Sequence, residues 1–207
     1  MKIIFATNNQ DKYKELKEIM HDFPVEILSM KEAGIFIEPE ENGKTFIANA
    51  TIKAKAVFAA APCGSLIIAD DSGLEIDYMD KEPGVDSALF MGVNTSYRIR
   101  NKAIIDRLSG VPDEKRTARF ICVIVAILPD GTLLSSEGVM EGRIAYAESG
   151  DNGFGYDPIF YLPEYGCTSA TLPPDQKNLI SHRGKALQQM KEILKRENLF
   201  SENINCQ

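Results

Sequence analysis

The 207-residue chain is 44% hydrophobic and 26% charged, a composition typical of one ordinary globular domain. Its formal net charge of −7 argues against non-specific nucleic-acid binding, which needs a basic face. No stretch approaches the ~18 consecutive apolar residues of a membrane span, and the N-terminus lacks the apolar core of a signal peptide, so we expect a cytoplasmic protein without a membrane partner.

The first third of the chain alternates strand and helix signals. Residues 2–6 predict a buried strand, and a polar turn over 7–11 leads into a helix with apolar residues at helical spacing. Asn8 or Asn9 is a suitable N-cap for this helix, and Lys12 lies in its first turn. Such a strand, loop and helix N-terminus commonly hold phosphate, although a capped helix with a solvated lysine has the same signature. A strand over 25–30, an acidic loop and a helix capped by Thr45 follow.

The rest of the chain is organised around residues 66–77. An apolar run ends in two adjacent carboxylates, Asp70 and Asp71, and Ser72-Gly73 predicts a turn into a second short strand. Neighbouring side chains of a strand point to opposite faces, so both carboxylates reach one spot only if the turn begins between them. We expect one of them to enter a site and the other to support it. The alternative is an ordinary turn without a function.

The second half predicts a mixed sheet. A helix starts at Asn94 or Thr95, keeps Ile99 on its inner face and closes at Gly110. A long strand over 117–128 turns at 129–131 into a strand over 132–144, and this hairpin breaks strict strand–helix alternation. The predicted fold class is therefore α/β with a mixed sheet. We expect one domain over residues 1–197 and a frayed tail over 198–207.

Two later segments carry candidate binding residues. The glycine-rich loop over 149–163 contains Phe154 and Tyr156, either of which could stack on a flat ring, and the alternative is a loop whose aromatic residues plug the domain edge. Lys177 falls in a second polar loop. His182 and Arg183 open the last helix, where the helix dipole disfavours cations, and this placement indicates a nearby anion or electron-rich ring.

Five separated motifs occur in one order along the chain. They are Thr-Asn-Asn-Gln-Asp-Lys over 7–12, Glu-Glu-Asn-Gly-Lys-Thr-Phe over 40–46, Ala-Asp-Asp-Ser-Gly over 69–73, Phe-Gly-Tyr-Asp-Pro over 154–158 and Ser-His-Arg-Gly over 181–184. Together they resemble the inosine triphosphate pyrophosphatase family, the dITP/XTP pyrophosphatases that clear deaminated purine nucleotides. The resemblance implies an elongated α/β fold with a mixed, twisted β-sheet flanked by helices and two lobes around a central nucleotide cleft. It also implies a homodimer that hydrolyses ITP, dITP and XTP with Mg²⁺, or alternatively Mn²⁺, as cofactor.

The resemblance also assigns roles to individual residues. Asp71 would accept the proton of the attacking water, and Glu40 and Asp71 would hold the metal ion. From the chemistry of the residues, Asp70 is the alternative acceptor, because a carboxylate bound directly to Mg²⁺ is a poor base. Asn8 departs from a glycine common in the family, and Leu89 from an arginine. The nucleotide would be bound by Thr7, Asn8, Asn9, Gln10, Asp11, Lys12, Ser72, Phe154, Gly155, Tyr156, Asp157, Lys177, His182 and Arg183.

The types of residue present also fit this chemistry when they are considered without the resemblance. Mg²⁺ prefers oxygen ligands such as Glu40 and Asp71, whereas two histidines and four scattered cysteines argue against zinc. We expect water to attack the α-phosphorus and pyrophosphate to leave, stabilised by Lys12 and the metal. Arg183, His182 or backbone N–H groups would read the purine 6-oxo group. Two alternatives stay open: a pyrophosphatase for pyrimidine or other modified nucleotides, and a nucleotide-binding protein without turnover.

Overall fold

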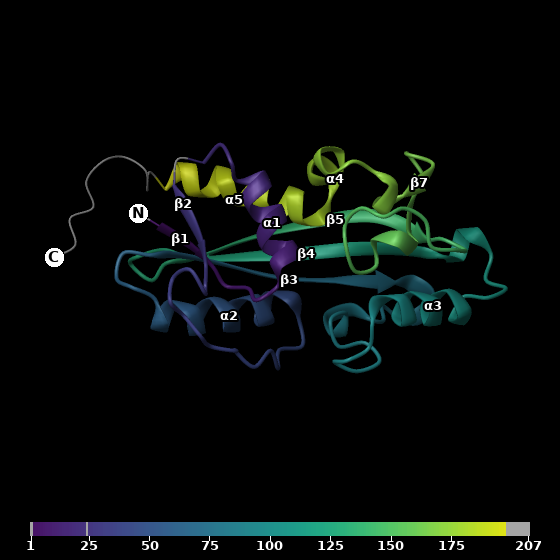
Figure 1. Ribbon diagram of the computed structural model, residues 1–207, viewed down its shortest axis with the longest axis horizontal. Helices are drawn as coiled ribbons and strands as arrows, with labels where there is room; N and C mark the ends of the chain where they lie inside the picture. The colour runs from purple at the N-terminus through teal and green to yellow at the C-terminus, as the bar shows by residue number, and fades with distance from the viewer. Residues whose placement is uncertain (1, 24, 198–207) are drawn as a thin grey trace. The chain divides into compact units, whose positions relative to one another are not determined.

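The computed structural model describes residues 2–23 and 25–197 (Figure 1). The predicted tail over 198–207 lies outside these residues. Seven strands form one sheet in the order β2-β1-β3-β4-β5-β6-β7. The strands are β1 (Lys2–Phe5), β2 (Glu26–Ser29), β3 (Leu66–Ile76), β4 (Thr117–Ile127), β5 (Leu133–Ile144), β6 (Phe160–Leu162) and β7 (Cys167–Thr168). The α-helices are α1 (Gln10–Ile19), α2 (Phe46–Ala60), α3 (Tyr97–Arg107), α4 (Pro174–Ile180) and α5 (His182–Arg196).

The sheet is mixed, as predicted. β1 pairs in parallel with β2 and β3, whereas β6 is antiparallel to both β5 and β7. β4 and β5 form the expected hairpin: Leu128 N–H donates to Thr132 O beside the turn, and Ile144 N–H donates to Arg116 O at the other end, both at 2.9 Å. The α/β class is therefore confirmed. The elongated shape and the cleft implied by the resemblance stay predictions.

One prediction about the central stretch is wrong. Ser72 and Gly73 do not turn the chain, and β3 runs through them without a break. The strand lies between β1 and β4 in the sheet, and pairing with its neighbours outweighs the local turn preference of Asp-Ser-Gly. Asp70 and Asp71 are therefore consecutive residues of one strand, and their side chains point to opposite faces.

Two helix predictions also need correction. α3 begins at Tyr97, after Ser96, rather than at Asn94 or Thr95, and its Ile99 is 54% exposed instead of facing inward. Lys177 lies in the short helix α4 rather than in a loop. Proline is favoured in the first turn of a helix, because its missing N–H would have no partner there, and Pro174 occupies that place.

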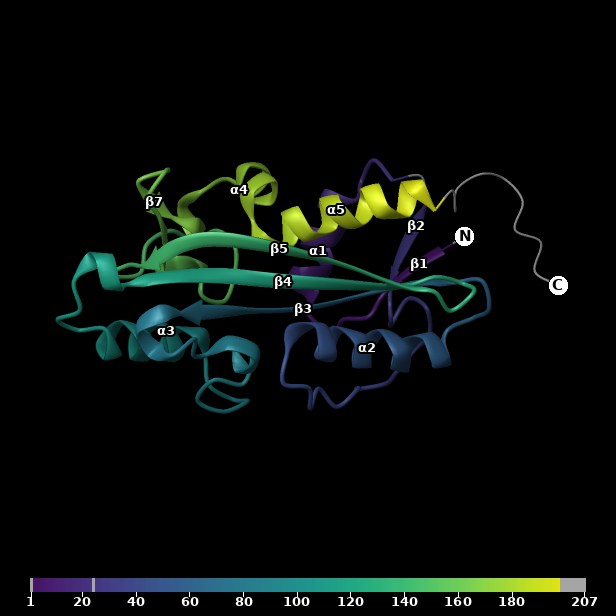
Figure 2. The same cartoon turned by 180° about the vertical axis from the view of Figure 1, so that it is seen from behind.

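The described chain folds as two compact units. Unit 1 comprises residues 2–71 (without 24), 122–138 and 185–197. Its core joins β1, β3 and β4 to α1 and α5, and buries Phe5, Leu16 and Leu187 completely. α2 lies on the opposite side of these strands from α5 in both views (Figures 1 and 2). Side chains of Asn9 and Thr45 cap α1 and α2 as predicted.

Unit 2 comprises residues 72–121 and 139–184 and has a core of its own. Leu74 of β3, Ile104 of α3 and Phe160 of β6 are fully buried in it. No helix in the described part of the chain is both long enough and apolar enough to cross a membrane. The expectation of one domain over 1–197 stays a prediction.

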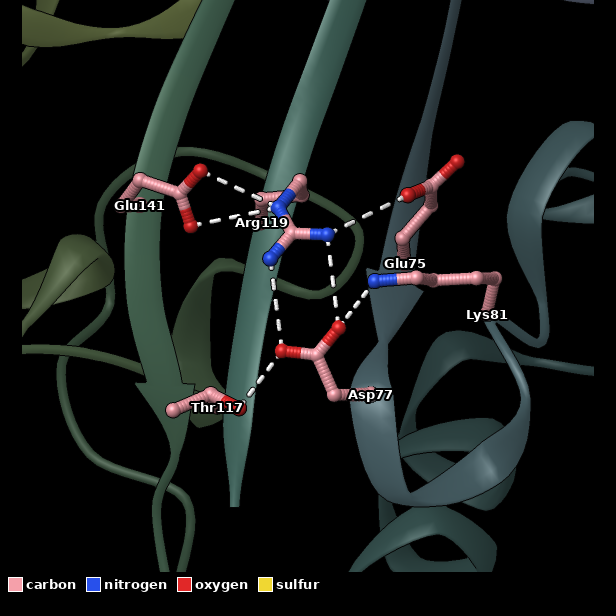
Figure 3. Close-up of polar contacts among 6 residues, drawn as sticks. All are labelled: Glu75, Asp77, Lys81, Thr117, Arg119 and Glu141. Carbon is pink, nitrogen blue, oxygen red and sulfur yellow. Dashed lines mark hydrogen bonds and ion pairs between the residues drawn. The ribbon is translucent and has the colours of Figure 1, made fainter. Parts of the chain in front are cut away.

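A network of charged side chains links three strands of unit 2 (Figure 3). Arg119 of β4 lies at the centre of this network. Its guanidinium lies 3.7 Å from Glu75 of β3, 3.1 Å from Glu141 of β5 and 3.3 Å from Asp77. Asp77 also accepts a hydrogen bond from Thr117 and pairs with Lys81, and these contacts, the Lys81 hydrogen bond first, hold its pKa below the ordinary value. Its ion pairs therefore connect β3, β4 and β5 through their side chains.

Candidate active site

The predicted phosphate loop leads into α1. Asn9 Oδ1 accepts hydrogen bonds from the backbone N–H groups of Asp11 at 2.9 Å and Lys12 at 3.1 Å, and Thr7 Oγ1 accepts one from Asn9 N–H at 3.1 Å. The predicted N-cap at Asn9 is confirmed, and it occupies two of the donors that an anion would use at a helix N-terminus. The exposed residues of this loop are Asn8, Asn9, Gln10 and Asp11. Their contact with substrate stays a prediction.

Two lysines and three carboxylates gather at the end of this loop, within unit 1. Lys12 Nζ lies 3.0 Å from Asp70 Oδ2, while Lys53 Nζ lies 2.7 Å from Glu41 Oε2 and 3.8 Å from Asp71 Oδ1. We name these five residues the carboxylate–lysine cluster. Because side chains alternate along β3, Asp70 meets a lysine from α1 and Asp71 meets one from α2. That one of the two carboxylates enters a site while the other supports it stays a prediction.

Burial and charge together shift the pKa values in this cluster. Burial raises the pKa of Asp71 to about 6, against the attraction of Lys53 and Lys12, and the negative charges of Glu41 and Asp70 raise it further. Burial alone would lower the pKa of Lys53, but Asp70, Asp71 and Glu41 outweigh it and raise that pKa. Lys53 thus stays charged at neutral pH, whereas Asp71 can take up or release a proton near it.

The donors in this cluster fit a hard cation. Asp71 Oδ2 is buried and has no hydrogen-bond partner among the described residues, which leaves one carboxylate oxygen available to a ligand. The described residues contain no group of three or more histidine, cysteine or acidic side chains arranged as a complete metal site. Glu40, the second predicted ligand, is exposed, and it is the negative charge of the neighbouring Glu41 that helps to raise the pKa of Asp71. The pairing of Glu40 with Asp71 stays a prediction.

A second cluster lies in unit 2, around the glycine-rich loop. The carboxylate of Asp157, 3% exposed, accepts hydrogen bonds from Phe154 N–H at 2.9 Å, Lys177 Nζ at 2.6 Å and Ser169 Oγ at 2.9 Å. Gly153 has a φ of +73°, and a Cβ there would lie 2.2 Å from Asp157 Oδ2. Only glycine allows the loop to pass this close to the carboxylate.

Phe154 lies beside two cations in this second cluster. Lys177 Nζ lies 5.3 Å and Arg183 Cζ 5.7 Å from the centroid of its ring, which is partly exposed. Arg183 also donates a hydrogen bond from Nη2 to Ser72 Oγ at 3.0 Å. We name Ser72, Phe154, Asp157, Lys177 and Arg183 the aromatic–basic cluster. An aromatic face flanked by cations is suited to a flat, electron-rich ring with oxo groups.

The two basic residues that open α5 lie against the chain's own rings. The His182 ring stacks on Phe120, with centroids 4.8 Å apart and planes 14° apart, and the Arg183 guanidinium lies over Phe154. These electron-rich rings are aromatic side chains of unit 2 itself, and the predicted binding of an anion or a further ring near His182 and Arg183 stays a prediction. His182 and Arg183 are both buried, so this packing fixes their side chains.

The two aromatic residues of the loop have different surroundings. Tyr156 is 4% exposed, donates its hydroxyl to Ser87 O at 2.7 Å and contacts Tyr97 edge-on at 5.1 Å between centroids. Its ring belongs to the core of unit 2. Of the two stacking candidates, Phe154 is therefore the one whose ring remains partly exposed.

Sequence reasoning missed Lys53, Glu41 and Ser169. A signal for Lys53 exists: the inward face of α2 carries Ala50, Ala54 and Val57, and Lys53 lies on the same stripe at helical spacing. A lysine in an apolar stripe indicates a buried carboxylate partner. Glu41 and Ser169 carry no comparable signal, because neither interrupts an apolar stripe at helical spacing.

Comparisons with known proteins agree over nearly the whole chain. Residues 3–193 match the model of a family described as the Ham1 family. The chain is 46% identical over 198 residues to the dITP/XTP pyrophosphatase of Clostridium perfringens, covering 94% of this chain and 97% of that protein. For the dITP/XTP pyrophosphatase of Desulforamulus reducens, the identity is 47% over 196 residues, covering 95% of this chain and 96% of that protein.

Two solved structures are similar as well. The Staphylococcus aureus Ham1 protein has a TM-score of 0.84 and 37% identity, covering 95% of this chain and 100% of that one, and a HAM1 protein from Coxiella burnetii has a TM-score of 0.83 and 39% identity, covering 95% and 99%.

Proposed function

This chain belongs to the Ham1 family, and on that premise we propose that it hydrolyses ITP, dITP and XTP to the nucleoside monophosphate and pyrophosphate. The substrate class is supported by relatives that are named dITP/XTP pyrophosphatases and match nearly the whole chain. The observation that carries hydrolysis is Asp71, a buried acid with a pKa of about 6 beside Lys53. A buried carboxylate with a raised pKa next to two lysines is typical of sites that transfer protons.

The carboxylate–lysine cluster suits the triphosphate. Asp71 accepts the proton of the water that attacks the α-phosphorus, because an acceptor works best when its pKa lies near the working pH. Lys12 and Lys53 place positive charge where the leaving pyrophosphate gains negative charge. Asp70 is fully buried and paired with Lys12, which makes it the alternative acceptor and the positioning partner of that lysine.

A divalent cation belongs to this proposal. The partnerless Asp71 Oδ2 supports Asp71 as one ligand, and Glu40 is the second ligand that we propose. Mg²⁺ bound there supplies charge neutralisation and polarises the phosphoryl group, and Mn²⁺ is the alternative metal. Asp71 thus has two proposed roles, which the experiments below separate.

The aromatic–basic cluster suits the base. Phe154 offers a partly exposed face for a purine, and Arg183 beside it can donate hydrogen bonds to a 6-oxo group. Hypoxanthine and xanthine accept at that position, whereas adenine donates and would leave buried donors unpaired. The proposal also includes a homodimer, which the family resemblance implies, a cytoplasmic location and the lack of nucleic-acid partners.

The first test is pyrophosphate release from ITP, dITP, XTP, GTP, ATP and a pyrimidine triphosphate with Mg²⁺. We expect release from the first three and at least tenfold less from the others. Preferential release from the pyrimidine nucleotide would support the alternative substrate class. Tight binding of ITP without any release would support the non-catalytic alternative.

The second test separates the roles of Asp71. In Asp71→Asn, loss of the proton acceptor lowers kcat at saturating Mg²⁺ and removes the acid limb of the pH profile. Loss of a metal ligand instead raises the Mg²⁺ concentration needed for half-maximal rate. Asp70→Asn is the matched control, and it should keep the acid limb of the pH profile. If Asp70→Asn removes that limb and Asp71→Asn keeps it, the acceptor is Asp70.

A further inference from the structure

We propose that Asn101 and Ser169 are positioning residues, which hold the loop over 153–157 from two sides and so set the affinity for the nucleotide. This inference rests on the proposed function of the aromatic–basic cluster. Neither residue needs to touch the substrate, because each acts through a loop atom: Asn101 through the carbonyl of Gly155, and Ser169 through the carboxylate of Asp157.

Asn101 anchors the loop from α3. It is 2% exposed, and its Nδ2 donates hydrogen bonds to Gly155 O at 3.2 Å and to Glu148 Oε1 at 2.9 Å. One turn earlier on the same helix, Tyr97 contacts Tyr156. Asparagine is a poor residue for a helix interior, so its presence in α3 is best explained by these tertiary contacts.

Ser169 anchors the loop from the other side. It is fully buried in a short 3-10 helix (Ser169–Thr171), and its hydroxyl donates to Asp157 Oδ1 at 2.9 Å. The other carboxylate oxygen of Asp157 accepts from Phe154 N–H and from Lys177. Ser169 therefore fixes the rotation of a carboxylate that in turn fixes the backbone of Phe154. Without the Ser169 hydroxyl, Asp157 Oδ1 would be buried without this hydrogen bond, so we expect the carboxylate to rotate toward another donor.

These anchors matter because the loop is intrinsically loose. Phe154 lies between Gly153 and Gly155, both with positive φ, and glycine gives a free loop many accessible conformations. Two anchors restrict the loop before the nucleotide arrives, so that binding does not have to order it. Loss of either anchor should weaken binding about tenfold, which corresponds to about 1.4 kcal/mol. The groups that we propose for hydrolysis belong to the carboxylate–lysine cluster, so kcat should change little.

The kinetic test uses Ser169→Ala and Asn101→Ala, with Ser136→Ala as the matched control. Ser136 is another buried serine whose hydroxyl donates a hydrogen bond, in this case to a backbone carbonyl, Ala186 O at 2.8 Å, and it lies in unit 1. With ITP and Mg²⁺, we expect KM to rise about tenfold in both anchor variants while kcat stays within about twofold, and the control to match the wild type. An unchanged KM, or a loss of kcat at unchanged KM, overturns the proposal.

A second readout does not depend on hydrolysis. The chain contains no tryptophan, so Phe154→Trp places a single reporter in the loop. In this background, Ser169→Ala and Asn101→Ala should raise the acrylamide quenching constant about twofold and lower the anisotropy, whereas Ser136→Ala should change neither. If the protein fails to hydrolyse any triphosphate, the proposed function fails, but the reporter still tests the anchors. Unchanged quenching in both variants refutes the inference even if hydrolysis is normal.

Milder variants keep the test decisive if an alanine variant does not fold. Asn101→Asp keeps the shape of the side chain but removes the Nδ2 donor, and Ser169→Cys replaces a strong donor with a weak one. We expect the same rise in quenching from both, in proteins whose circular dichroism matches the wild type. Folded variants with wild-type quenching overturn the proposal.

Discussion

Replacing Asp71 by Asn should make the protein more stable at neutral pH while it lowers kcat for hydrolysis. The physical reason is the cost of keeping a buried carboxylate charged, which raises the pKa of Asp71 to about 6. Asparagine has nearly the same shape but carries no charge, so the variant resembles the protonated protein at every pH. Groups that work in a reaction often lower stability in this way.

The magnitude follows from the two pKa values. The step from 3.8 in the unfolded chain to about 6 in the folded one is worth about 3 kcal/mol, at about 1.4 kcal/mol per pH unit. Because the folded pKa is the higher one, the stability that protonated Asp71 contributes is fully present below pH 3.8 and is lost as the pH rises through 6. Asp71→Asn should therefore gain about 3 kcal/mol above pH 7 and nothing near pH 4.

Thermal unfolding followed by circular dichroism, from pH 4 to pH 8 with a chelator present, measures this difference. For a chain of this length about 3 kcal/mol raises Tm by about 6–12 °C. Asp77→Asn is a control of opposite sign, because Lys81 and Thr117 lower the pKa of Asp77, so this variant should lose stability above pH 4. An Asp71→Asn variant that is less stable than the wild type at pH 8, or a gap in Tm that does not depend on pH, refutes the reasoning.

Three further substitutions test the fold. Asn9→Ala removes the cap of α1 and should cost about 1 kcal/mol in urea unfolding, and an unchanged midpoint would show that the cap is dispensable. Arg119→Met leaves the carboxylates of its network facing one another and should lower the free energy of unfolding by about 1–3 kcal/mol at low ionic strength. This decrease should be smaller in 1 M NaCl, and a decrease that does not depend on salt contradicts an electrostatic cause. Gly184→Ala places a Cβ 1.8 Å from Asn178 O and should cost about 3 kcal/mol, so a wild-type melting temperature is incompatible with this packing.

Elements with strong local signals could be predicted from the sequence. The predicted strand over 117–128 and the observed β4 (Thr117–Ile127) agree within one residue, because a long apolar run and a Pro-Asp-Gly turn are both local features. The caps at Asn9 and Thr45 are local for the same reason. Ser72-Gly73 was predicted wrongly because its outcome depends on the neighbouring strands of the sheet, which no short window reveals.

The candidate site was predictable only in part. Local pattern singled out Asp71 and Arg183 and the resemblance supplied their expected roles, and the family it indicates is confirmed by the match over residues 3–193. Neither the resemblance nor the local pattern led to Lys53, whose carboxylate partners come from a loop and a strand outside its own helix. The different burial of Phe154 and Tyr156 likewise depends on what packs around the loop, and two aromatic residues two positions apart give no sign of it.

The division of the chain into units has a consequence for how the protein folds during synthesis. Unit 2 is complete in sequence once residue 184 has left the ribosome, whereas unit 1 needs α5, the last helix of the described chain. The buried Leu187 and Met190 of α5 pack in one core with Ile3 and Phe5 of β1. The apolar first strand must therefore wait until residues 187–190 have been synthesised for its final packing partner. During that time, it is a natural target for chaperones that bind exposed hydrophobic segments, and unit 2 is free to fold first.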